Sequence, residues 1–398
     1  MGYQPLSFEP FFGWVNRSRI LYSPGVRKEL AYELAQLGAR SVVVLSDTGL
    51  SKAGVTEKIV EQITGSDLKL AGIFDNIQQD ARINNINEGA EFYRNQGADS
   101  MVVVGGGSVM DTAKAINILI GSGLSDFKPL ADQAGLWEDA SPLPPHIAFP
   151  TTAGTGCEVT NALVVLDLDS KAKLSVTHPF CNSDIAMLDP ELTVSLPPKV
   201  TAFTGMDALT HAVEGITSIG AEPISDALGL HAIRLISTCL PVVVKDPQNV
   251  EARGNMLIAS TMAAMCFCNT MTGATHAAAH ALGAIHGIPH GMANSIMLPL
   301  VMEFNIQENP QRYVMIADAF GFNTQGLDPF EAAMKAVEAV KELKHSVGLT
   351  ETLKDFGVTS DEDQLAPLVE LAAGDGQISY NPRYVEESDL LALFQKAV

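Results

Sequence analysis

The sequence is poor in positive charge. Its 398 residues include 25 Lys and Arg against 46 Asp and Glu, which gives a formal net charge of −21. An acidic surface repels phosphate backbones, so we expect no nucleic-acid partner. The same negative field opposes an anionic cofactor, which would need local hydrogen-bond donors in order to bind.

Long apolar runs and targeting signals are also missing. No segment has about 18 or more consecutive apolar residues, the length that a membrane-spanning helix needs. The N-terminal stretch MGYQPLSFEPFFGW has neither a basic start nor an apolar run, which argues against a signal peptide. We therefore expect no association with a membrane.

Cysteine usage argues against a disulfide framework. The chain has five cysteines, an odd number, and no Cys-x-x-Cys pair. This pattern is typical of reduced thiols and predicts a cytoplasmic location. Cys266 and Cys268 lie in an apolar helical run, where we expect them to pack in a core.

The length and the order of local patterns predict two domains. Up to about residue 190, β-rich runs alternate with helical patterns, which predicts a parallel sheet with helices on both faces. From about residue 191 onward, apolar residues recur at helical spacing and strand signals nearly vanish. We predict an α/β domain in residues 1–190 and an all-helical domain in 191–398, with the boundary in the proline-rich stretch 182–198. Strands are expected at 41–46, 68–74, 100–108 and 146–150, and helices at 54–63, 83–97 and 109–120.

A glycine-rich loop follows one of these strands. The stretch VVVGGGSVMDTAK places Gly105, Gly106 and Gly107 directly before a helix. Bare backbone amides and a helix N-terminus can bind a phosphate without any lysine or arginine cluster. Ser108 is expected to cap the helix, with Asp111 completing the cap. The alternative is a tight turn without a ligand, since the GxGxxG spacing of a standard Rossmann loop is absent.

Two further features favour a nucleotide site. The loop PTTAGTGCEVT brings Thr151 and Thr152 to the end of the next strand. Two such loops at one edge of a parallel sheet line the crevice where ligands of open α/β sheets bind. Asp47 ends the first strong strand, where a carboxylate can accept from a ribose hydroxyl and repel a 2′-phosphate. The alternative for Asp47 is a turn or a helix N-cap.

Histidines are concentrated in the second half of the chain. Asp207 and His211 are four residues apart in GMDALTHAVEG, so their side chains project from one face of the expected helix. Four of the nine histidines of the chain then fall in one short stretch, as His276, His280, His286 and His290.

These histidines point to a metal site. The surrounding residues are mostly Ala, Gly, Leu and Ile, and buried polar groups in such surroundings need partners. A carboxylate with several imidazoles suits Fe²⁺ or Zn²⁺ and does not suit Ca²⁺ or Mg²⁺. For Asp207 and His211 alone, a hydrogen bond on the helix face is the simpler interpretation. A four-ligand site leaves His280 and His286 over, as proton carriers or as hydrogen-bonded groups beside the metal.

Five motifs taken in order resemble the iron-containing (group III) alcohol dehydrogenases over nearly the whole chain. They are GGGSVMDTAK, PTTAGTGCEVT, AMLDPELTVSLPP, TAFTGMDALTHAVEG and HAAAHALGAIHGIPHGMANSIMLP. Val109 departs from the usual Pro, and Cys157 from the usual Ser. The resemblance implies an N-terminal dinucleotide-binding α/β domain with a parallel sheet and an all-α C-terminal domain, the dehydroquinate synthase-like architecture, with the active site in the cleft between them. The ligand motifs argue against the zinc-dependent glycerol dehydrogenase-like and dehydroquinate synthase-like relatives on this scaffold.

The resemblance also implies a role for individual residues. His280 matches a histidine associated with proton transfer or with nicotinamide contact near the metal. The metal ligands fall on Asp207, His211, His276 and His290. The cofactor positions fall on Asp47, which matches an acidic residue linked to NAD preference, and on Gly105, Gly106, Gly107, Ser108, Asp111, Thr151, Thr152 and Lys173.

The implied reaction is hydride transfer between NAD(H) and a small alcohol or aldehyde, with Fe²⁺ or Zn²⁺ as the metal. Lack of a basic cluster near the ligand motifs favours a neutral substrate, and the family suggests a homodimer or a larger homo-oligomer. The rival hypothesis is a non-catalytic nucleotide- or metal-responsive protein on the same scaffold. The presence of all four ligand residues argues against that rival.

Overall fold

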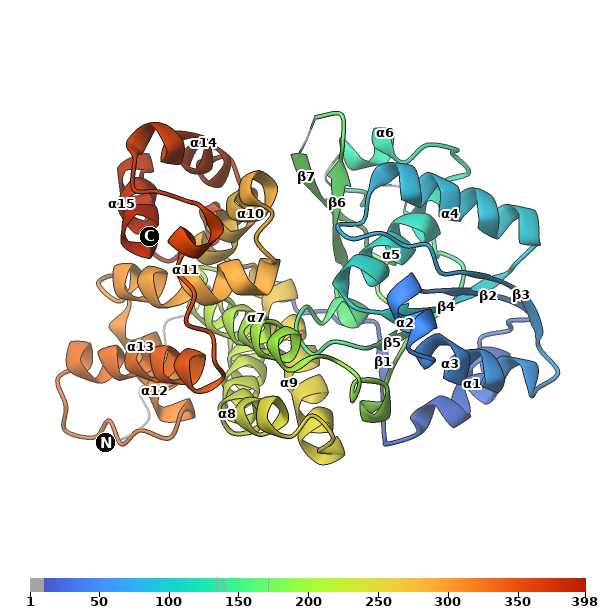
Figure 1. The fold of residues 1–398 in the computed structure, drawn as a ribbon, viewed down its shortest axis with the longest axis horizontal. Helices are drawn as coiled ribbons and strands as arrows, with labels where there is room; N and C mark the ends of the chain where they lie inside the picture. The colour runs from blue at the N-terminus through green and yellow to red at the C-terminus, as the bar shows by residue number, and fades with distance from the viewer. Residues whose placement is uncertain (1–10, 134, 139, 171) are drawn as a thin grey trace. The chain divides into compact units, whose positions relative to one another are not determined.

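The computed structural model describes residues 11–133, 135–138, 140–170 and 172–398 (Figure 1). The chain divides into two compact units, one of residues 16–201 and 242–261 and the other of residues 202–241 and 262–398 with the N-terminal stretch up to Val15. The predicted domain boundary near residue 190 stays a prediction. Most of the stretch on which we expect no signal peptide, residues 1–10, lies outside the described residues.

The first unit contains a six-stranded sheet in which every pair of neighbouring strands is parallel. Its strand order is β1-β8-β5-β4-β2-β3, so the prediction of a parallel sheet is confirmed. The strands are β1 (Arg19–Tyr22), β2 (Ser41–Leu45), β3 (Lys69–Phe74), β4 (Ser100–Gly105), β5 (His146–Pro150) and β8 (Ile185–Leu188).

Helices cover both faces of this sheet (Figure 1). Val42 and Val44 of β2 lie in the core that α1 and α3 cover, whereas Val43 and Leu45 lie in the core that α4 and α5 cover. Because successive side chains of a strand point to opposite faces, a strand buried on both faces must be apolar throughout. The elements are α1 (Leu30–Gln36), α2 (Thr48–Lys52), α3 (Val55–Thr64), α4 (Ile83–Gln96), α5 (Gly107–Ser122) and α6 (Lys128–Ala131), with 3₁₀ turns η1 (Val26–Glu29), η2 (Cys157–Val159) and η3 (Pro190–Leu192).

The strand order of the sheet reverses between β2 and β4. β3 lies on the outer side of β2, whereas β5 and β8 follow on the other side of β4. Counted from β2, this is the 2-1-3-4-5 order of flavodoxin-like sheets, whose ligands bind where the order reverses. Asp47 follows β2 and the glycine-rich loop follows β4, so both lie at this switch point.

A small antiparallel hairpin was not among our expected elements. It consists of β6 (Ala162–Asp167) and β7 (Ala172–Thr177). The sequence does carry a signal for it, because an apolar run is followed by a Leu-Asp-Ser turn and then by alternating polar and apolar residues. The strands β1 and β8 were also not predicted, and each has only four residues.

The second half of the chain is helical, as predicted. From Pro198 to the C-terminus, every described element is a helix or a 3₁₀ turn. They are α7 (Pro198–Thr217), α8 (Pro223–Lys245), α9 (Val250–Thr270), α10 (Ala274–His286), α11 (His290–Asn305), α12 (Pro310–Ala319), α13 (Pro329–Ser346), η4 (Leu353–Phe356), α14 (Glu362–Ala373), η5 (Gly376–Tyr380) and α15 (Glu387–Ala397).

Within the described residues, α8 is long and apolar enough to cross a membrane, and the pair α9 and α10 would pass the same test but bends by 105°. Length and apolar composition are weak evidence for a membrane span, because the core helices of soluble proteins pass the same test. Ile233, Ile236, Leu240 and Val243 of α8 are in fact fully buried in the fold. All five cysteines carry free thiols, with Cys266 buried and Cys268 half-buried.

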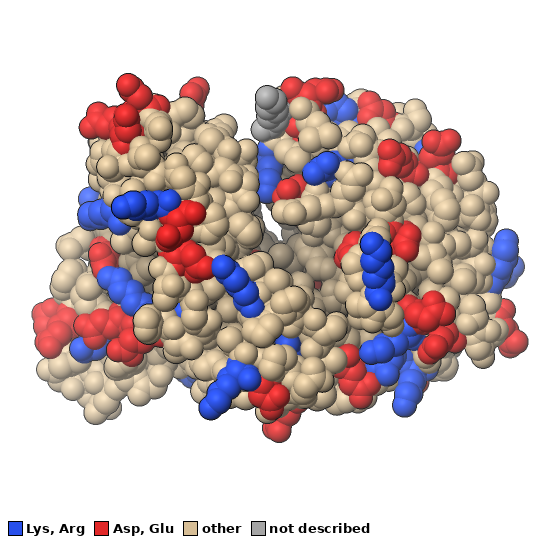
Figure 2. Space-filling model, viewed as in Figure 1, with Lys and Arg blue, Asp and Glu red and all other residues tan. Residues whose placement is uncertain are grey.

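The acidic balance is visible at the surface. On the face shown in Figure 2, Asp and Glu side chains gather at the top left over α14, and Lys and Arg side chains are spread over the same face. Asp361, Glu362 and Asp363 lie at the start of α14, where carboxylates interact favourably with the helix dipole.

Replacing Arg312 by Met should destabilise the helical unit strongly. Arg312 is buried and donates to Asp226 Oδ1 at 2.7 Å and to the Ile216 carbonyl at 2.6 Å. The change leaves the buried Asp226 carboxylate without this cation, which costs about 3–5 kcal/mol. Urea unfolding measures the loss. Lys335→Met removes an exposed ion pair with Glu338 and should leave stability unchanged. Equal effects of the two variants would contradict the stabilising role of Arg312.

Candidate functional site

The glycine-rich loop and the Thr-rich loop pack directly against each other. The amide of Thr151 donates to the Gly105 carbonyl at 3.0 Å, which continues the pairing of β4 with β5. A Cβ on Gly106 would lie 3.1 Å from Thr152, and one on Gly107 would lie 2.8 Å from Thr155. A side chain at Gly107 would therefore collide with Thr155, and one at Gly106 would press against Thr152. The structure thus brings together the predicted residues of both loops.

The capping prediction at α5 is wrong. The N-cap is Gly106, which has no side chain to accept a hydrogen bond, so no side chain caps the first turn. Ser108 Oγ instead accepts from the Asp80 amide at 3.1 Å, and Asp111 Oδ2 accepts from the Val164 amide at 3.1 Å. The physical reason is that the amides of Asp80 and Val164 compete with the amides of the first helical turn for these side-chain oxygens. The helix N-terminus therefore keeps backbone donors that an anion can use.

The β6–β7 hairpin holds Lys173 beside this loop. Lys173 Nζ forms an ion pair with Asp80 Oδ1 at 3.0 Å, and the amide of Asp80 bonds to Ser108. Asp80 and Ala81 have positive φ angles of 71° and 44°, which are uncommon outside glycine and often mark functional turns. The structure thus places Lys173 and Asp111 near the start of α5.

Asp47 caps the short helix α2. Its Oδ1 accepts from the Leu50 amide at 3.0 Å, so the N-cap alternative is observed. A carboxylate has further acceptor capacity, and the residue is only half-buried at the end of β2. The observed cap therefore leaves room for a second role as an acceptor from a ribose.

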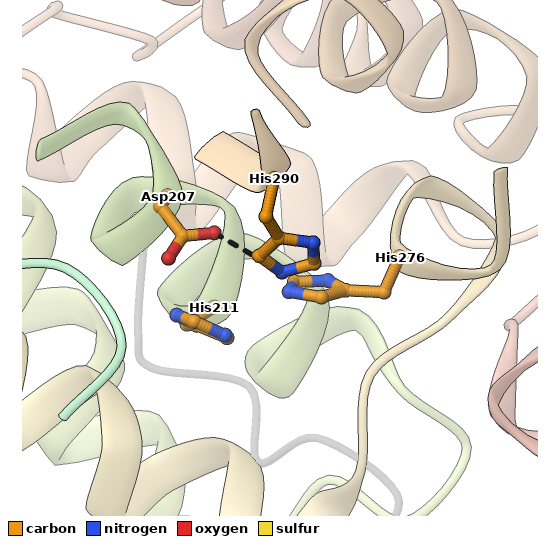
Figure 3. Close-up of side chains that lie close together, drawn as sticks. All are labelled: Asp207, His211, His276 and His290. Carbon is orange, nitrogen blue, oxygen red and sulfur yellow. Dashed lines mark ion pairs between the residues drawn. The ribbon is translucent and has the colours of Figure 1, made fainter. Parts of the chain in front are cut away.

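Four side chains converge on one point of the helical unit (Figure 3). Asp207 and His211 come from α7, His276 comes from the first turn of α10, and His290 is the first residue of α11. Each offers one ligand atom, and these four atoms all lie within 4.8 Å of one another. Three segments far apart in the sequence therefore present one carboxylate and three imidazoles to a common point.

The chemistry of this group fits a divalent transition metal. Burial is the main cause that lowers the pKa of His276 and of His290 well below the usual value, so both rings are in the neutral form that binds metals. Burial acts to raise the pKa of Asp207, but the neighbouring histidines and Asn294 outweigh it, and the carboxyl is ionised. His211 Nδ1 is buried without a hydrogen-bond partner among the described residues. A metal would satisfy such an atom.

An amide stands among the four side chains. Asn294 Nδ2 lies 2.7 Å from Asp207 Oδ1, 3.3 Å from His276 Nε2 and 3.2 Å from His290 Nε2. Asn294 is fully buried, four residues after His290 on α11. The Asn294 amide thus contacts three of the four clustered side chains.

Two carboxylates that the sequence did not predict as site residues contact the Nδ1 atoms of His276 and His280. Glu214 Oε2 lies 2.6 Å from His276 Nδ1, and Asp375 Oδ2 lies 2.7 Å from His280 Nδ1. A carboxylate at Nδ1 fixes the ring proton there and leaves Nε2 free. Glu214 had a signal, because it lies seven residues after Asp207 on the same helix face. Asp375 had none, since nothing local links it to α10.

The two surplus histidines differ in position. The His280 ring lies on the His290 ring, with centroids 5.2 Å apart and planes 17° apart, and 6.1 Å from the His276 ring. His280 therefore borders the cluster. His286 is the last residue of α10, ten residues beyond His276, and is half-buried. It is not among the four clustered residues.

The chain is similar to known dehydrogenases and reductases over nearly its whole length. The 1,3-propanediol dehydrogenase of Klebsiella pneumoniae is 36% identical over 363 residues, which cover 91% of this chain and 92% of that protein. The NAD-dependent methanol dehydrogenase of Bacillus methanolicus is 33% identical over 374 residues, covering 94% and 96%. The solved structure of sulfoacetaldehyde reductase from Bifidobacterium kashiwanohense in complex with NAD⁺ superposes with a TM-score of 0.86 at 29% identity, covering 98% of this chain and 99% of that one.

Family models match both halves of the chain. Residues 17–190 match the model described as iron-containing alcohol dehydrogenase, and residues 201–398 match the C-terminal model of the same family. The resemblance of the sequence motifs is thereby confirmed. With two relatives above 30% identity over at least nine-tenths of its length, the chain belongs to the iron-containing alcohol dehydrogenase family.

Proposed function

We propose that this alcohol dehydrogenase transfers a hydride between NAD(H) and a small alcohol or aldehyde, at a divalent metal held by Asp207, His211, His276 and His290. The observation that carries the proposal is the convergence of these four side chains within a buried part of the helical unit. The donor set suits Fe²⁺, for which the family is named, and also suits Zn²⁺.

Each group has a separate task in the proposed reaction. The metal would supply Lewis acidity, which lowers the pKa of an alcohol and polarises a carbonyl. NAD would supply the hydride acceptor. Asp207 and the three histidine rings would hold the ion, and the hydrogen bond from Asn294 would orient the Asp207 carboxylate. His280 holds or moves the proton at Nε2, since Asp375 fixes the other proton at Nδ1.

The switch point of the sheet is the proposed site of the cofactor. Backbone amides at the start of α5, together with Ser108, Thr151 and Thr152, would bind the pyrophosphate. Lys173 would add a positive charge beside these donors. Gly105, Gly106 and Gly107 allow this close approach, and Asp111 anchors the hairpin that carries Lys173. Asp47 would bind the ribose and disfavour NADP.

We also propose a substrate class, a cellular compartment and an oligomeric state. The names of the relatives include propanediol, methanol and lactaldehyde, and also choline and sulfoacetaldehyde, which carry a charge. They support an alcohol or aldehyde substrate, and the lack of a basic cluster near the ligand motifs supports a neutral one. Five free thiols support a reducing compartment such as the cytoplasm. The acidic balance argues against nucleic acid as a partner, and we propose no membrane partner. A homodimer or a larger homo-oligomer is expected from the family.

Metal removal should abolish activity, and His276→Ala should prevent its recovery. Metal-stripped protein is assayed anaerobically for NADH oxidation with a panel of small aldehydes, before and after Fe²⁺ or Zn²⁺ is added. The wild type should recover with at least one ion, whereas the variant loses a ligand and should not. The matched control is His286→Ala, which should recover fully. Full activity of metal-free His276→Ala would refute the proposed function.

Substitution of His280 should separate chemistry from metal binding. His280→Ala should keep its metal and its affinity for NADH but lose about 10²–10⁴-fold in kcat, the contribution of a general acid–base group. Asp375→Asn should also lower kcat. An amide can donate to Nδ1 of His280, and the ring proton would then move to Nε2. Metal analysis and steady-state kinetics measure both effects. An unchanged kcat in His280→Ala would remove this residue from the reaction.

Asp47→Ser should admit NADPH. A serine keeps the helix cap but removes the charge that would face a 2′-phosphate. We expect kcat/KM with NADPH to rise roughly 10- to 100-fold while kcat/KM with NADH falls, since a like-charge contact near the surface is worth a few kcal/mol. Initial rates with both cofactors test this. Equal use of the two cofactors by the wild type would contradict the role of Asp47.

A further inference from the structure

The helix α7 carries a third functional side chain on the face that bears Asp207 and His211. Glu214 follows at the seventh position after Asp207, two helical turns along the same stripe. The residue is 5% exposed, so its carboxylate lies inside the protein. A buried carboxylate is costly unless hydrogen bonds compensate it, and the groups around Glu214 are therefore informative.

Both oxygens of Glu214 are committed to the start of α10. Oε2 lies 2.6 Å from His276 Nδ1, and Oε1 accepts from the Thr275 amide at 2.6 Å. A Cβ on Gly273 would lie 3.3 Å from Oε1, so the backbone approaches the carboxylate closely. Because Nδ1 of His276 points at Glu214, its Nε2 faces the cluster, where Asn294 touches it. One carboxylate thus sets the orientation of the ring.

The charge of the cluster is incomplete without Glu214. A divalent ion with Asp207 and three neutral imidazoles keeps one net positive charge, and a buried net charge is unfavourable. Through its contact with His276, Glu214 would supply the second negative charge. Burial raises the pKa of the Glu214 carboxyl, and a bound cation would oppose this effect and favour the ionised form. The buried assembly of the ion, Asp207 and Glu214 is then neutral.

We propose that Glu214 is a positioning residue that sets the affinity of the site for a divalent cation, by fixing the Nδ1–H tautomer of His276 and by balancing the charge of the ion. The inference rests on the proposed function only in its assumption that the four clustered residues bind a metal. It does not depend on which alcohol is oxidised.

Glu214→Gln tests both parts of the proposal, because glutamine has the size of glutamate but lacks its charge and one of its acceptor oxygens. Two donors, His276 Nδ1–H and the Thr275 amide, face two acceptor oxygens in the native protein. An amide of the same size has one acceptor and one donor group, so it cannot satisfy both, and it also removes the charge. Glu222→Gln is the matched control, because Glu222 is equally buried and accepts from the amides of Ile224 and Ser225, away from the histidines.

The experiment measures metal binding by the full-length protein rather than activity. Zn²⁺ affinity is determined by chelator competition for the wild type, Glu214→Gln, Glu222→Gln and His276→Ala, and the absorption spectrum of the Co²⁺-loaded protein reports the ligand field. We expect Glu214→Gln to bind Zn²⁺ about 10–100-fold more weakly, with shifted Co²⁺ bands. Glu222→Gln should match the wild type in both.

Two outcomes would overturn the proposal. One is Glu214→Gln with wild-type affinity and spectrum while His276→Ala loses the metal. The other is weaker binding with an unshifted Co²⁺ spectrum, together with a lower melting temperature of the metal-free protein. That result would mean that Glu214 only stabilises the position of α10. Metal binding by His276→Ala equal to the wild type would instead refute the metal site of the proposed function, and the two failures are thus distinguishable.

Discussion

The burial of polar groups among apolar helices is the constraint on which the rest of this site depends. Asp207, His211 and His276 are each at most 5% exposed, among buried apolar residues of α7 and α10. A buried carboxylate or imidazole without a partner costs several kcal/mol, so the fold must supply partners for each. Helices α7, α10 and α11 therefore meet at one point, where hydrogen bonds, and in the proposed enzyme a metal ion, satisfy these groups.

The position of α10 depends on residues near the C-terminus. Asn381 Oδ1 accepts from the Ala274 amide at 3.2 Å and from Asn305 Nδ2 at 2.9 Å, and Gln377 Oε1 accepts from Thr272. Together with Asp375 beside His280, these contacts hold the start of α10. The helix that carries two functional histidines is thus fixed by a segment about 100 residues later, as the Thr272–Gln377 separation of 105 positions shows.

In the α/β unit, the electrostatic constraint is the binding of an anionic cofactor by an acidic chain. A chain of net charge −21 must bind a negatively charged cofactor, and it places few cations at the loops that would do so. Bare amides at the start of α5 act over short distances, so the distant acidic surface weakens them little in salt. This arrangement requires glycines, since Cβ atoms at Gly106 and Gly107 would collide with the Thr-rich loop or press against it.

The sequence by itself determined the local patterns: the strands β2, β3, β4 and β5, the helices α3, α4 and α5, the helical second half, and the spacing of Asp207 and His211. These follow from periodicity, turn residues and apolar runs, which act between near neighbours in the chain. The motifs also predicted which histidines would gather. Only the tertiary structure decided that Ser108 bonds to Asp80 instead of capping α5, that Glu214 lies against His276, and that Asp375 lies against His280. Each of these pairs joins residues at least 28 positions apart, and such contacts depend on how helices and loops pack, which local spacing does not specify.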